Sequence, residues 1–126
     1  MNLTKLDNIF SRYIRLKNSV NGYCTCISCG KIERFQDVDA GHYINRKFYA
    51  LRYNETNVQP QCRYCNRFCE GNIAEFGLAL QKKYGEQIIK DLVSKKHNYI
   101  KWTQFDIDTL EKYYKNEVKL LEKSVF

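Results

Sequence analysis

The sequence predicts an α+β fold that is built around a four-cysteine metal site. Two C-x-x-C pairs, Cys26 with Cys29 and Cys62 with Cys65, have the spacing at which two thiolates in one tight turn bind the same ion. The stretch between the pairs is longer than the loop of a simple zinc ribbon, so we expect a folded insert there. Amphipathic helical patterns precede and follow this stretch.

Length and spacing predict one domain. Residues 1–126 match the size of a single domain, and a structural zinc would reinforce its modest hydrophobic core. We expect the zinc-containing core over about residues 22–84, with an N-terminal helix over about residues 3–18 and C-terminal helices over about residues 86–124. No internal repeat or long linker indicates a second domain.

The first expected element is amphipathic. Its apolar side chains recur at helical spacing, while basic side chains take the other faces of the helix. The apolar positions are Leu3, Leu6, Phe10, Tyr13, Ile14 and Leu16. Residues 18–22 (NSVNG) have the composition of a turn, and residues 23–28 (YCTCIS) predict a short strand that enters the first cysteine pair.

The stretch between the cysteine pairs predicts a hairpin and then a loop. Residues 31–44 and 48–53 are the expected arms, joined around residues 45–47. Residues 54–61 (NETNVQPQ) are expected to form a polar loop. The second cysteine pair is expected to open a helix, because the proline just before it is a stop signal.

The rest of the chain predicts helices. Gly85 is expected to end the helical pattern that follows the second cysteine pair. A further helix is expected over residues 86–96, and a long amphipathic one over residues 103–123. Thr103, with Asp106 three positions on, has the pattern of a capping box.

Charge and hydropathy restrict the partners. The formal net charge of +7 indicates a polyanionic partner. No apolar run approaches the length of a membrane span, and the N-terminal segment lacks the uninterrupted apolar run of a secretory signal. We therefore expect an intracellular, cytoplasmic protein with no membrane partner. The basic residues from His42 to Arg67 are Arg46, Lys47, Arg52, Arg63 and Arg67.

The cysteines favour zinc over disulfides. They bunch as C-x-C-x-x-C and C-x-x-C-x-x-x-C, which suits metal ligation in a reducing compartment. Cys24 and Cys69 are expected to be free thiols outside the site, although Cys69, four positions after Cys65, is an alternative ligand. A closed shell of four cysteines has no open position for a substrate, so the zinc is expected to be structural.

His42 and Asn66 carry chemistry that a structural zinc site does not need. Histidine can take a proton from water near neutral pH, as attack on a phosphodiester requires. Taken alone, His42 is equally consistent with a hydrogen-bonded strand residue or a zinc ligand. Asn66 directly follows Cys65, so one helical turn can bind zinc with one residue and direct an oxygen at a second metal with the next.

Several segments together resemble a known family. The residues FSRYIRL, CISCG, DAGHY, LRYNETN and QCRYCN are similar to the NinG (Rap) family of phage recombination endonucleases. More broadly, the pattern resembles the zinc-containing HNH (ββα-metal) nucleases, including the phage endonuclease VII type. The resemblance covers about residues 5–95. It implies a treble-clef ββα core, cleavage that depends on Mg²⁺ or Mn²⁺, and branched DNA, such as a Holliday junction or D-loop, as substrate.

The resemblance also assigns roles to residues. His42 corresponds to the general base, Asn57 to the loop asparagine that holds the histidine's strand, and Asn66 to a ligand of the catalytic metal. Many HNH enzymes place a metal-binding aspartate immediately before the histidine, where this chain has Gly41. Asp39 lies on the same strand face as that glycine and is the expected substitute ligand. Asp37 is the alternative on the same alternation.

Three further expectations concern partners and alternatives. The five basic residues are candidates for phosphate contacts, although a solvated charge is an equally good interpretation of each. A zinc module that binds nucleic acid without cutting it, or a site-specific HNH nuclease, would show similar cysteines and charge. Paired cuts on a junction favour a homodimer. Its expected surface is the stripe Ile107, Leu110, Tyr114, Val118 and Leu121, together with the apolar stripe of the first helix, unless both stripes pack on their own core.

Overall fold

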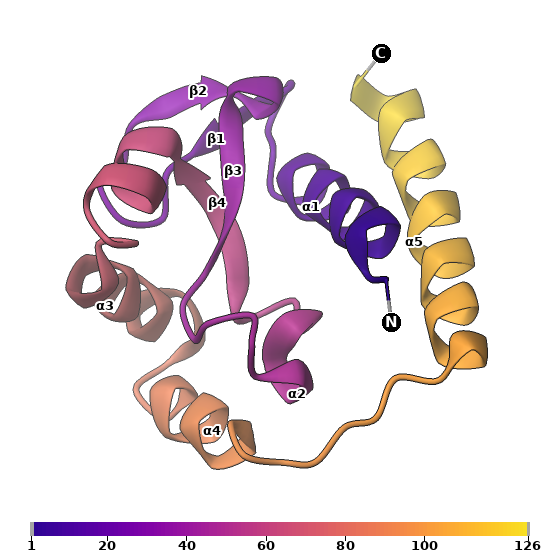
Figure 1. Ribbon diagram of the computed structural model, residues 1–126. Coiled ribbons are helices and arrows are strands. Elements are labelled where there is room, and N and C mark those ends of the chain that lie inside the picture. Colours follow the sequence, from indigo (N-terminus) through magenta and orange to yellow (C-terminus); the bar gives the residue numbers. More distant parts are fainter. Residues whose placement is uncertain (1, 126) are drawn as a thin grey trace.

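The computed structural model describes residues 2–125. Its elements follow the order α1 (Thr4–Lys17), β1 (Tyr23–Thr25), β2 (Ile32–Arg34), η1 (Phe35–Asp37), β3 (Val38–His42), α2 (Tyr49–Arg52), β4 (Val58–Cys62), η2 (Tyr64–Phe68), α3 (Ile73–Tyr84), α4 (Ile88–Lys95) and α5 (Gln104–Val125) (Figure 1). Two small antiparallel sheets, β1–β2 and β3–β4, lie among these helices. This mixture confirms the predicted α+β class.

The prediction of a hairpin between residues 31–44 and 48–53 is wrong in its second strand. β3 pairs with β4, in a register that runs from Val38 opposite Cys62 to His42 opposite Val58. Residues 48–53, the expected arm, contain the short helix α2 instead. β2 does form a hairpin, but its partner is β1.

The polar sequence of β4, VQPQC, was predicted to be part of a loop. All five of its residues are buried. The two glutamines can lie inside because their amide nitrogens find acceptors: Gln59 donates to the Thr56 carbonyl (3.0 Å) and Gln61 to the Ser28 hydroxyl (2.9 Å). A run that reads as a polar loop is therefore a fully buried strand of the second sheet.

α1 and α5 pack along each other on one side of β3 and β4 (Figure 1). Phe10 of α1 lies edge to face on Tyr114 of α5, with ring centroids 4.9 Å apart. Both predicted apolar stripes contribute to this core: Leu6, Phe10, Tyr13, Ile14, Ile107, Tyr114 and Val118 are buried, with Leu110 and Leu121 packed against them. The two stripes expected to form a dimer surface therefore pack against each other within one chain.

A second, smaller core lies on the other side of the β3–β4 pair. It joins α2, α3 and α4 to the loop after β3 (Figure 1). Its buried members are Ile44, Leu51, Phe76, Leu80 and Leu92. β3 and the loop after it thus lie between two packed groups of helices.

The ends of the helices match several predictions. α3 ends at Tyr84, and the following Gly85 has a φ of 100°, a conformation that favours glycine. At the start of α5, the Thr103 hydroxyl accepts from the Asp106 N–H and the Asp106 carboxylate accepts from the Thr103 N–H, each at 3.1 Å. This is the predicted capping box.

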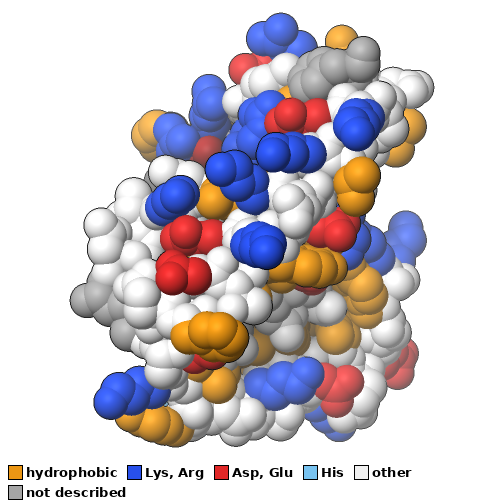
Figure 2. All heavy atoms as spheres, turned by 90° about the vertical axis from the view of Figure 1, so that its right-hand side faces the viewer, with side chains coloured by type: hydrophobic (Ala, Val, Ile, Leu, Met, Phe, Trp, Pro, Cys, Tyr) orange, Lys and Arg blue, Asp and Glu red, His pale blue; other side chains and the backbone are white. Residues whose placement is uncertain are grey.

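The outer surface beside α5 is mixed in character. Figure 2, which views the molecule from that side, shows lysine and arginine side chains interspersed with acidic and apolar ones. In the described part of the chain, no helix combines the length and the apolar character needed to cross a membrane.

Candidate functional site

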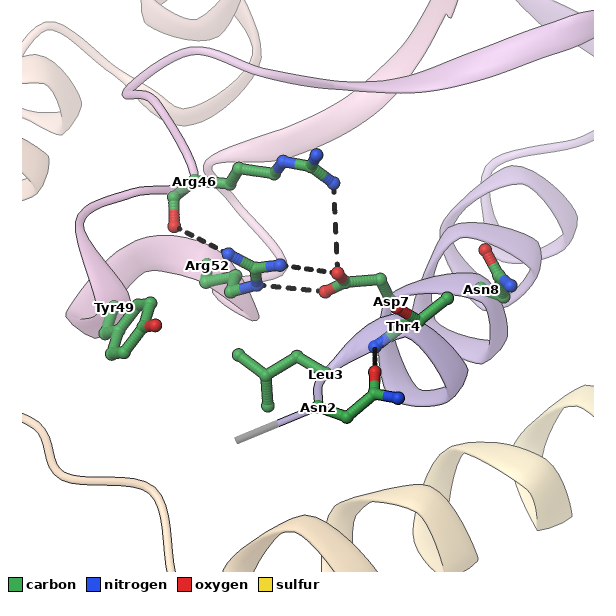
Figure 3. A pocket seen from close by; sticks show the side chains of 8 residues that line it. All are labelled: Asn2, Leu3, Thr4, Asp7, Asn8, Arg46, Tyr49 and Arg52. Atoms are coloured by element: carbon green, nitrogen blue, oxygen red, sulfur yellow. Dashed lines mark hydrogen bonds and ion pairs between the residues drawn. The ribbon is translucent and has the colours of Figure 1, made fainter.

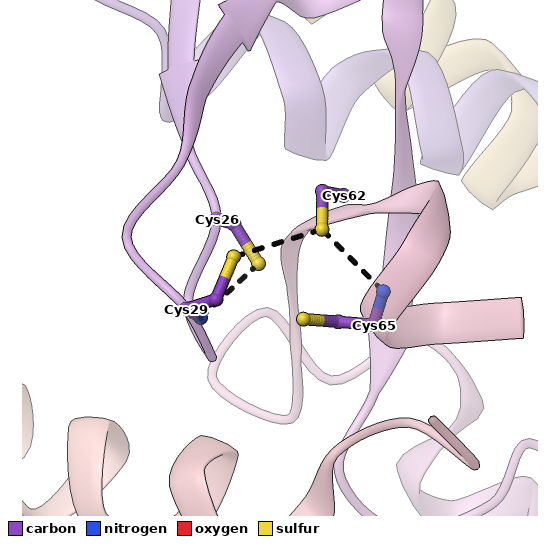
Figure 4. Close-up of side chains that lie close together, drawn as sticks. All are labelled: Cys26, Cys29, Cys62 and Cys65. Carbon is purple, nitrogen blue, oxygen red and sulfur yellow. Dashed lines mark hydrogen bonds between the residues drawn. The ribbon is translucent and has the colours of Figure 1, made fainter. Parts of the chain in front are cut away.

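The four predicted ligand cysteines converge on one point. Cys26 and Cys29 come from the turn after β1, and Cys62 and Cys65 from the end of β4 and from η2 (Figure 4). All four sulfur atoms lie within 4.8 Å of one another, with Cys29 Sγ 3.7 Å from Cys62 Sγ. Tetrahedral zinc with Zn–S bonds of about 2.3 Å separates its sulfurs by about 3.8 Å. The cluster can therefore bind a metal such as zinc.

Hydrogen bonds from the two turns favour thiolates. The Cys29 N–H is directed at Cys26 Sγ (3.5 Å), and the Cys65 N–H at Cys62 Sγ (3.4 Å). Burial opposes ionisation of Cys26, but backbone N–H groups outweigh it and lower its pKa to about 7. Burial raises the pKa of Cys65 to about 12. Four thiols this close cannot all ionise near neutral pH unless a cation compensates their charge.

The other two cysteines lie outside this cluster. Cys24 is fully buried in the core beside α1, and its thiol donates to the Arg15 carbonyl (3.1 Å). Burial raises its pKa to about 11, so it remains a thiol at neutral pH. Cys69 is half-buried just after η2. Both positions agree with the prediction of free thiols.

Asp39 and Asn66 meet beside the cysteine cluster. In the β3–β4 register, Asp39 is the residue after the partner of Cys62, and η2 brings Asn66 back over the start of β3. Asn66 Nδ2 donates to Asp39 Oδ2 at 3.0 Å. Arg67 donates to both Asp39 carboxylate oxygens, each at 2.9 Å. Asp37, the predicted alternative, pairs instead with Arg34 (3.0 Å).

His42 lines the same hollow as Asp39 and Asn66, a space of about 400 Å³. Its Nε2 lies 3.0 Å from the Arg52 carbonyl oxygen. Because a carbonyl only accepts, Nε2 carries the proton of the neutral ring and the lone pair is on Nδ1. Burial lowers the pKa of His42 below its usual value, with smaller contributions from Arg46 and Arg52. The ring is therefore neutral at pH 7.

Asn57 fixes the loop that follows His42. It is fully buried, and its Oδ1 accepts from the Ile44 N–H (2.8 Å). Its Nδ2 donates to the carbonyls of Ile44 (3.0 Å) and Leu51 (3.1 Å). One side chain thus satisfies backbone groups on both sides of the loop between β3 and α2.

Gly41 has a steric reason to lack a side chain. A Cβ atom at this position would lie 2.1 Å from Gln61 Oε1 and 3.0 Å from Gln61 Cβ. Gln61 is fully buried and anchored by hydrogen bonds, so it has little room to move. An aspartate therefore does not fit directly before His42, and the carboxylates that line the hollow are Asp39 and Asp7.

Sequence reasoning missed Asp7, which organises the other end of the hollow. Asp7 lies on α1, and its carboxylate accepts from Arg52 Nε (2.9 Å) and Arg52 Nη2 (2.5 Å) (Figure 3). It also accepts from the Tyr53 hydroxyl (2.7 Å). Arg46 also forms an ion pair with this carboxylate, with its Nη1 3.8 Å from Asp7 Oδ2. No sequence pattern could reveal a contact between α1 and α2, which lie far apart in the chain.

The five basic residues predicted to contact phosphate differ in how exposed their side chains are to solvent. The Arg52 side chain is only 13% exposed and is held by Asp7, so it belongs to the protein's internal network. The others have exposed side chains: Arg46, Lys47, Arg63 and Arg67. Arg63 lies 3.9 Å from Asp39 and donates to the Gln36 carbonyl (3.2 Å).

Three neighbouring hollows form one trough across this face. The hollow that contains Asp39 shares His42, Asn66 and Arg46 with a space of about 500 Å³ that extends to the start of α3. It shares Asp7, Arg46 and Arg52 with a space of about 620 Å³ at the N-terminal end of α1 (Figure 3). Of the predicted site residues, His42 and Asn66 line two of these spaces, and Asp39 lines the space of about 400 Å³.

Comparison with known proteins gives a consistent result. A family described as "Bacteriophage Lambda NinG protein" matches residues 3–124. "Protein ninG" of Escherichia phage lambda is 33% identical over 100 residues, which are 79% of this chain and 48% of the relative. The proteins of the same name from Escherichia phage 933W and Salmonella phage P22 are 32% and 31% identical over the same length, with 49% and 48% of each relative covered. The chain thus spans about half the length of these relatives. No solved structure matches it significantly.

Proposed function

The chain belongs to the NinG family of bacteriophage proteins, and from this premise we propose that it is a divalent-metal-dependent endonuclease that cuts branched DNA during phage recombination. One observation carries the proposal: Asn66 Nδ2 lies 3.0 Å from Asp39 Oδ2, in the hollow that His42 also lines. A structural zinc site needs none of these three residues. Hydrolysis of a phosphodiester uses a base and a metal-binding pair of this kind.

We assign the core to the treble-clef ββα-metal type. β3 and β4 supply the two strands, and the turn η2 with the following α3 supplies the helical part. The four cysteines tie the start and end of this unit together. In this assignment the zinc is structural, because its four ligands leave no open position.

Asp39 and Asn66 are the residues that would hold the catalytic cation. A carboxylate and an amide oxygen suit Mg²⁺ or Mn²⁺, which also retain waters and accept phosphate oxygens as ligands. Such an ion, when bound, supplies Lewis acid chemistry and neutralises charge that develops on the phosphate. Arg67 now donates to both Asp39 oxygens, so it competes with a cation for this carboxylate.

His42 acts as the general base in this proposal. Its Nδ1 takes a proton from a water molecule as the water oxygen bonds to phosphorus and the bond to the 3′ oxygen breaks. The Arg52 carbonyl keeps the other ring nitrogen protonated and so keeps Nδ1 available. Asn57 helps to position this carbonyl, because its Nδ2 donates to the carbonyl of the preceding residue, Leu51.

The trough provides phosphate contacts on both sides of these residues. Arg46, Lys47, Arg63 and Arg67 have exposed side chains along or beside it and are the proposed DNA-binding residues. Arg52 is better assigned to stabilising the site, because Asp7 occupies its guanidinium.

Branched DNA also bears on assembly. Resolving a junction requires two cuts on opposed strands, and one chain supplies one site, so we propose a homodimer on DNA. Because the apolar stripes of α1 and α5 are buried against each other, the dimer must use other surfaces. Light scattering with and without junction DNA tests this. A monomer mass in both conditions together with paired cuts would mean two sequential events.

A zinc module that binds DNA without cutting it is the second candidate. The ion pair between Arg67 and Asp39 favours it, since the carboxylate is already neutralised without a cation. His42 and Asn66 are then structural residues of the trough.

A cleavage assay separates the two candidates. Purified protein with Mg²⁺ or Mn²⁺ is incubated with a four-way junction, a three-way junction, a flap and the matching linear duplex, and products are resolved on a denaturing gel. We expect cuts near the branch point, and none from the His42→Ala variant. Binding to DNA without cleavage under all these conditions would favour the second candidate.

A further inference from the structure

Two aromatic side chains beside the candidate site are exposed to solvent. Tyr64 is 68% exposed and Phe68 is 76% exposed. Their rings stack on each other, with centroids 6.3 Å apart and planes inclined by 27°. Neither ring belongs to the two hydrophobic cores of the described residues. Since they contribute little to the fold, their exposure requires another explanation.

The pair lies directly beside arginines. Tyr64, Arg67 and Phe68 lie on η2 and Arg63 directly precedes it, and residues four apart on such a helical turn share a face. The arginine face is therefore next to the aromatic face. Both arginines reach Asp39, at 3.9 Å and 2.9 Å, so the segment that carries the aromatic pair also contacts a candidate metal-binding residue.

The turn that carries these side chains is rigidly held. Cys62 precedes it and Cys65 lies within it, and both belong to the buried cysteine cluster. The Gly71 N–H donates to the Cys65 carbonyl (3.0 Å), and Asn72 Nδ2 is directed at Cys65 Sγ (3.5 Å). The aromatic pair is thus presented on a fixed base, which lowers the entropy that a ligand loses on binding it.

We propose that Tyr64 and Phe68 form a stacking platform for unpaired bases of DNA at a point where strands separate. Basic side chains that contact phosphates beside aromatic rings that stack on bases are the combination that binds single-stranded nucleic acid. Fully paired duplex keeps its bases stacked and offers the platform no face. The platform rests on the proposed function and would let the protein distinguish branched DNA that exposes unpaired bases, such as a flap or D-loop, from linear duplex.

Binding to a forked DNA tests the platform directly. The fork carries 2-aminopurine, whose emission changes with stacking, at the first unpaired position. A linear duplex of the same length is the comparison, and both are measured by fluorescence without Mg²⁺ or Mn²⁺, so that no cleavage occurs. The double variant Tyr64→Ala/Phe68→Ala should lose the emission change and bind the fork about tenfold more weakly, the effect of losing about one stacked base. Its affinity for the duplex should stay within about twofold, because the arginines remain.

Two variants serve as controls. Phe105→Ala removes a ring that is 78% exposed on α5 and should alter neither measurement. Tyr64→Phe keeps both rings and should behave as wild type. Zinc content and circular dichroism establish that each variant is folded.

The outcomes separate the platform from the proposed function. If the double variant binds fork and duplex as wild type does, the platform is wrong. If wild-type protein binds duplex but neither prefers the fork nor alters the 2-aminopurine emission, the platform is wrong and the proposed DNA binding stands. If wild-type protein binds no DNA, both fail.

Discussion

Arg67 donates from two guanidinium nitrogens to the two carboxylate oxygens of Asp39, each at 2.9 Å. Asn66 adds a third donor to the same carboxylate. The charge of Asp39 is therefore balanced by the protein itself. A divalent cation at Asp39 must displace or share these contacts, which makes Arg67 a competitor of the cation as well as a candidate contact for DNA.

Replacing Arg67 should strengthen cation binding. In Arg67→Gln, the Asp39 carboxylate loses its ion pair, and we expect the Kd for Mn²⁺ without DNA to fall by about two- to fivefold, because the competing pair is exposed and therefore weak. Electron paramagnetic resonance of free Mn²⁺ measures it. Arg34→Gln, which breaks the pair with Asp37, should not change the Kd. An unchanged Kd in Arg67→Gln would show that Asp39 is not a ligand.

Loss of His42 should stop the chemistry and leave binding. His42→Ala removes the proposed base, so the single-turnover rate should fall by about 10² to 10⁴. Junction affinity, measured without Mg²⁺ or Mn²⁺, should stay within about twofold. His97→Ala is the matched control, because this other histidine is exposed and its ring lies against the Phe48 ring, away from the trough. An equal fall in the single-turnover rate in both variants would reject a specific role for His42.

The pH profile of cleavage should report the same residue. Burial lowers the pKa of His42 below its usual value and Arg46 and Arg52 lower it further, while the hydrogen bond to the Arg52 carbonyl and the Asp7 charge oppose this shift without cancelling it. The base form therefore persists below pH 6.5, and the acid limb of the single-turnover rate should have its midpoint under that value. Between the folded and unfolded pKa values the unfolded chain binds more protons, so His42 also makes stability fall as the pH falls through this range. A midpoint above 6.5 would contradict this assignment.

The sequence was informative where one local pattern determines the structure. The C-x-x-C spacing identified four cysteines whose sulfurs meet, and apolar periodicity located α1 and α5 within a few residues. The capping pattern of Thr103 and Asp106 also appears as predicted. Each of these features depends on residues that are close in the chain or on one helix face.

Prediction from the sequence failed where the structure depends on contacts between segments that are far apart in the chain. Gln59 and Gln61 read as loop residues, but hydrogen bonds to the distant Tyr84 and Ser28 hydroxyls help to make their burial in β4 possible. The role of Asp7 depends on α1 packing near α2, which brings it to Arg52 from 45 positions away. The expected dimer stripes were real apolar faces, but periodicity cannot tell which surface covers such a face.

The cysteine cluster should be required for folding. Structural zinc contributes on the order of 10 to 16 kcal/mol, which is similar to or larger than the whole stability of a small domain. Cys26→Ser should therefore give insoluble or unfolded protein that lacks zinc by elemental analysis. Cys69→Ser, outside the cluster, should fold and retain zinc. Folded, active wild-type protein without bound zinc would reject the zinc assignment.

Asp7 should support both the stability of the protein and the position of His42. Hydrogen bonds from Arg52 and Tyr53 outweigh burial and lower the pKa of Asp7, so its stabilising contribution is present at pH 7 and is lost as the pH falls below its usual 3.8. The side chains of Asp7 and Arg52 are only 21% and 13% exposed. Asp7→Asn should therefore lower the free energy of unfolding at pH 7 by about 2 kcal/mol.

The matched control is Asp37→Asn, whose ion pair with Arg34 is exposed and should contribute about 0.5 kcal/mol or less. Asp7 reaches the site through one residue, since it holds the Arg52 side chain and the Arg52 carbonyl holds His42 Nε2. Nitrogen-15 NMR of the His42 ring should show the Nε2-protonated form as dominant in the wild type and in Asp37→Asn, and a mixture of tautomers in Asp7→Asn. If Asp7→Asn lowers stability but leaves the His42 tautomer unchanged, Asp7 stabilises the fold without positioning the base.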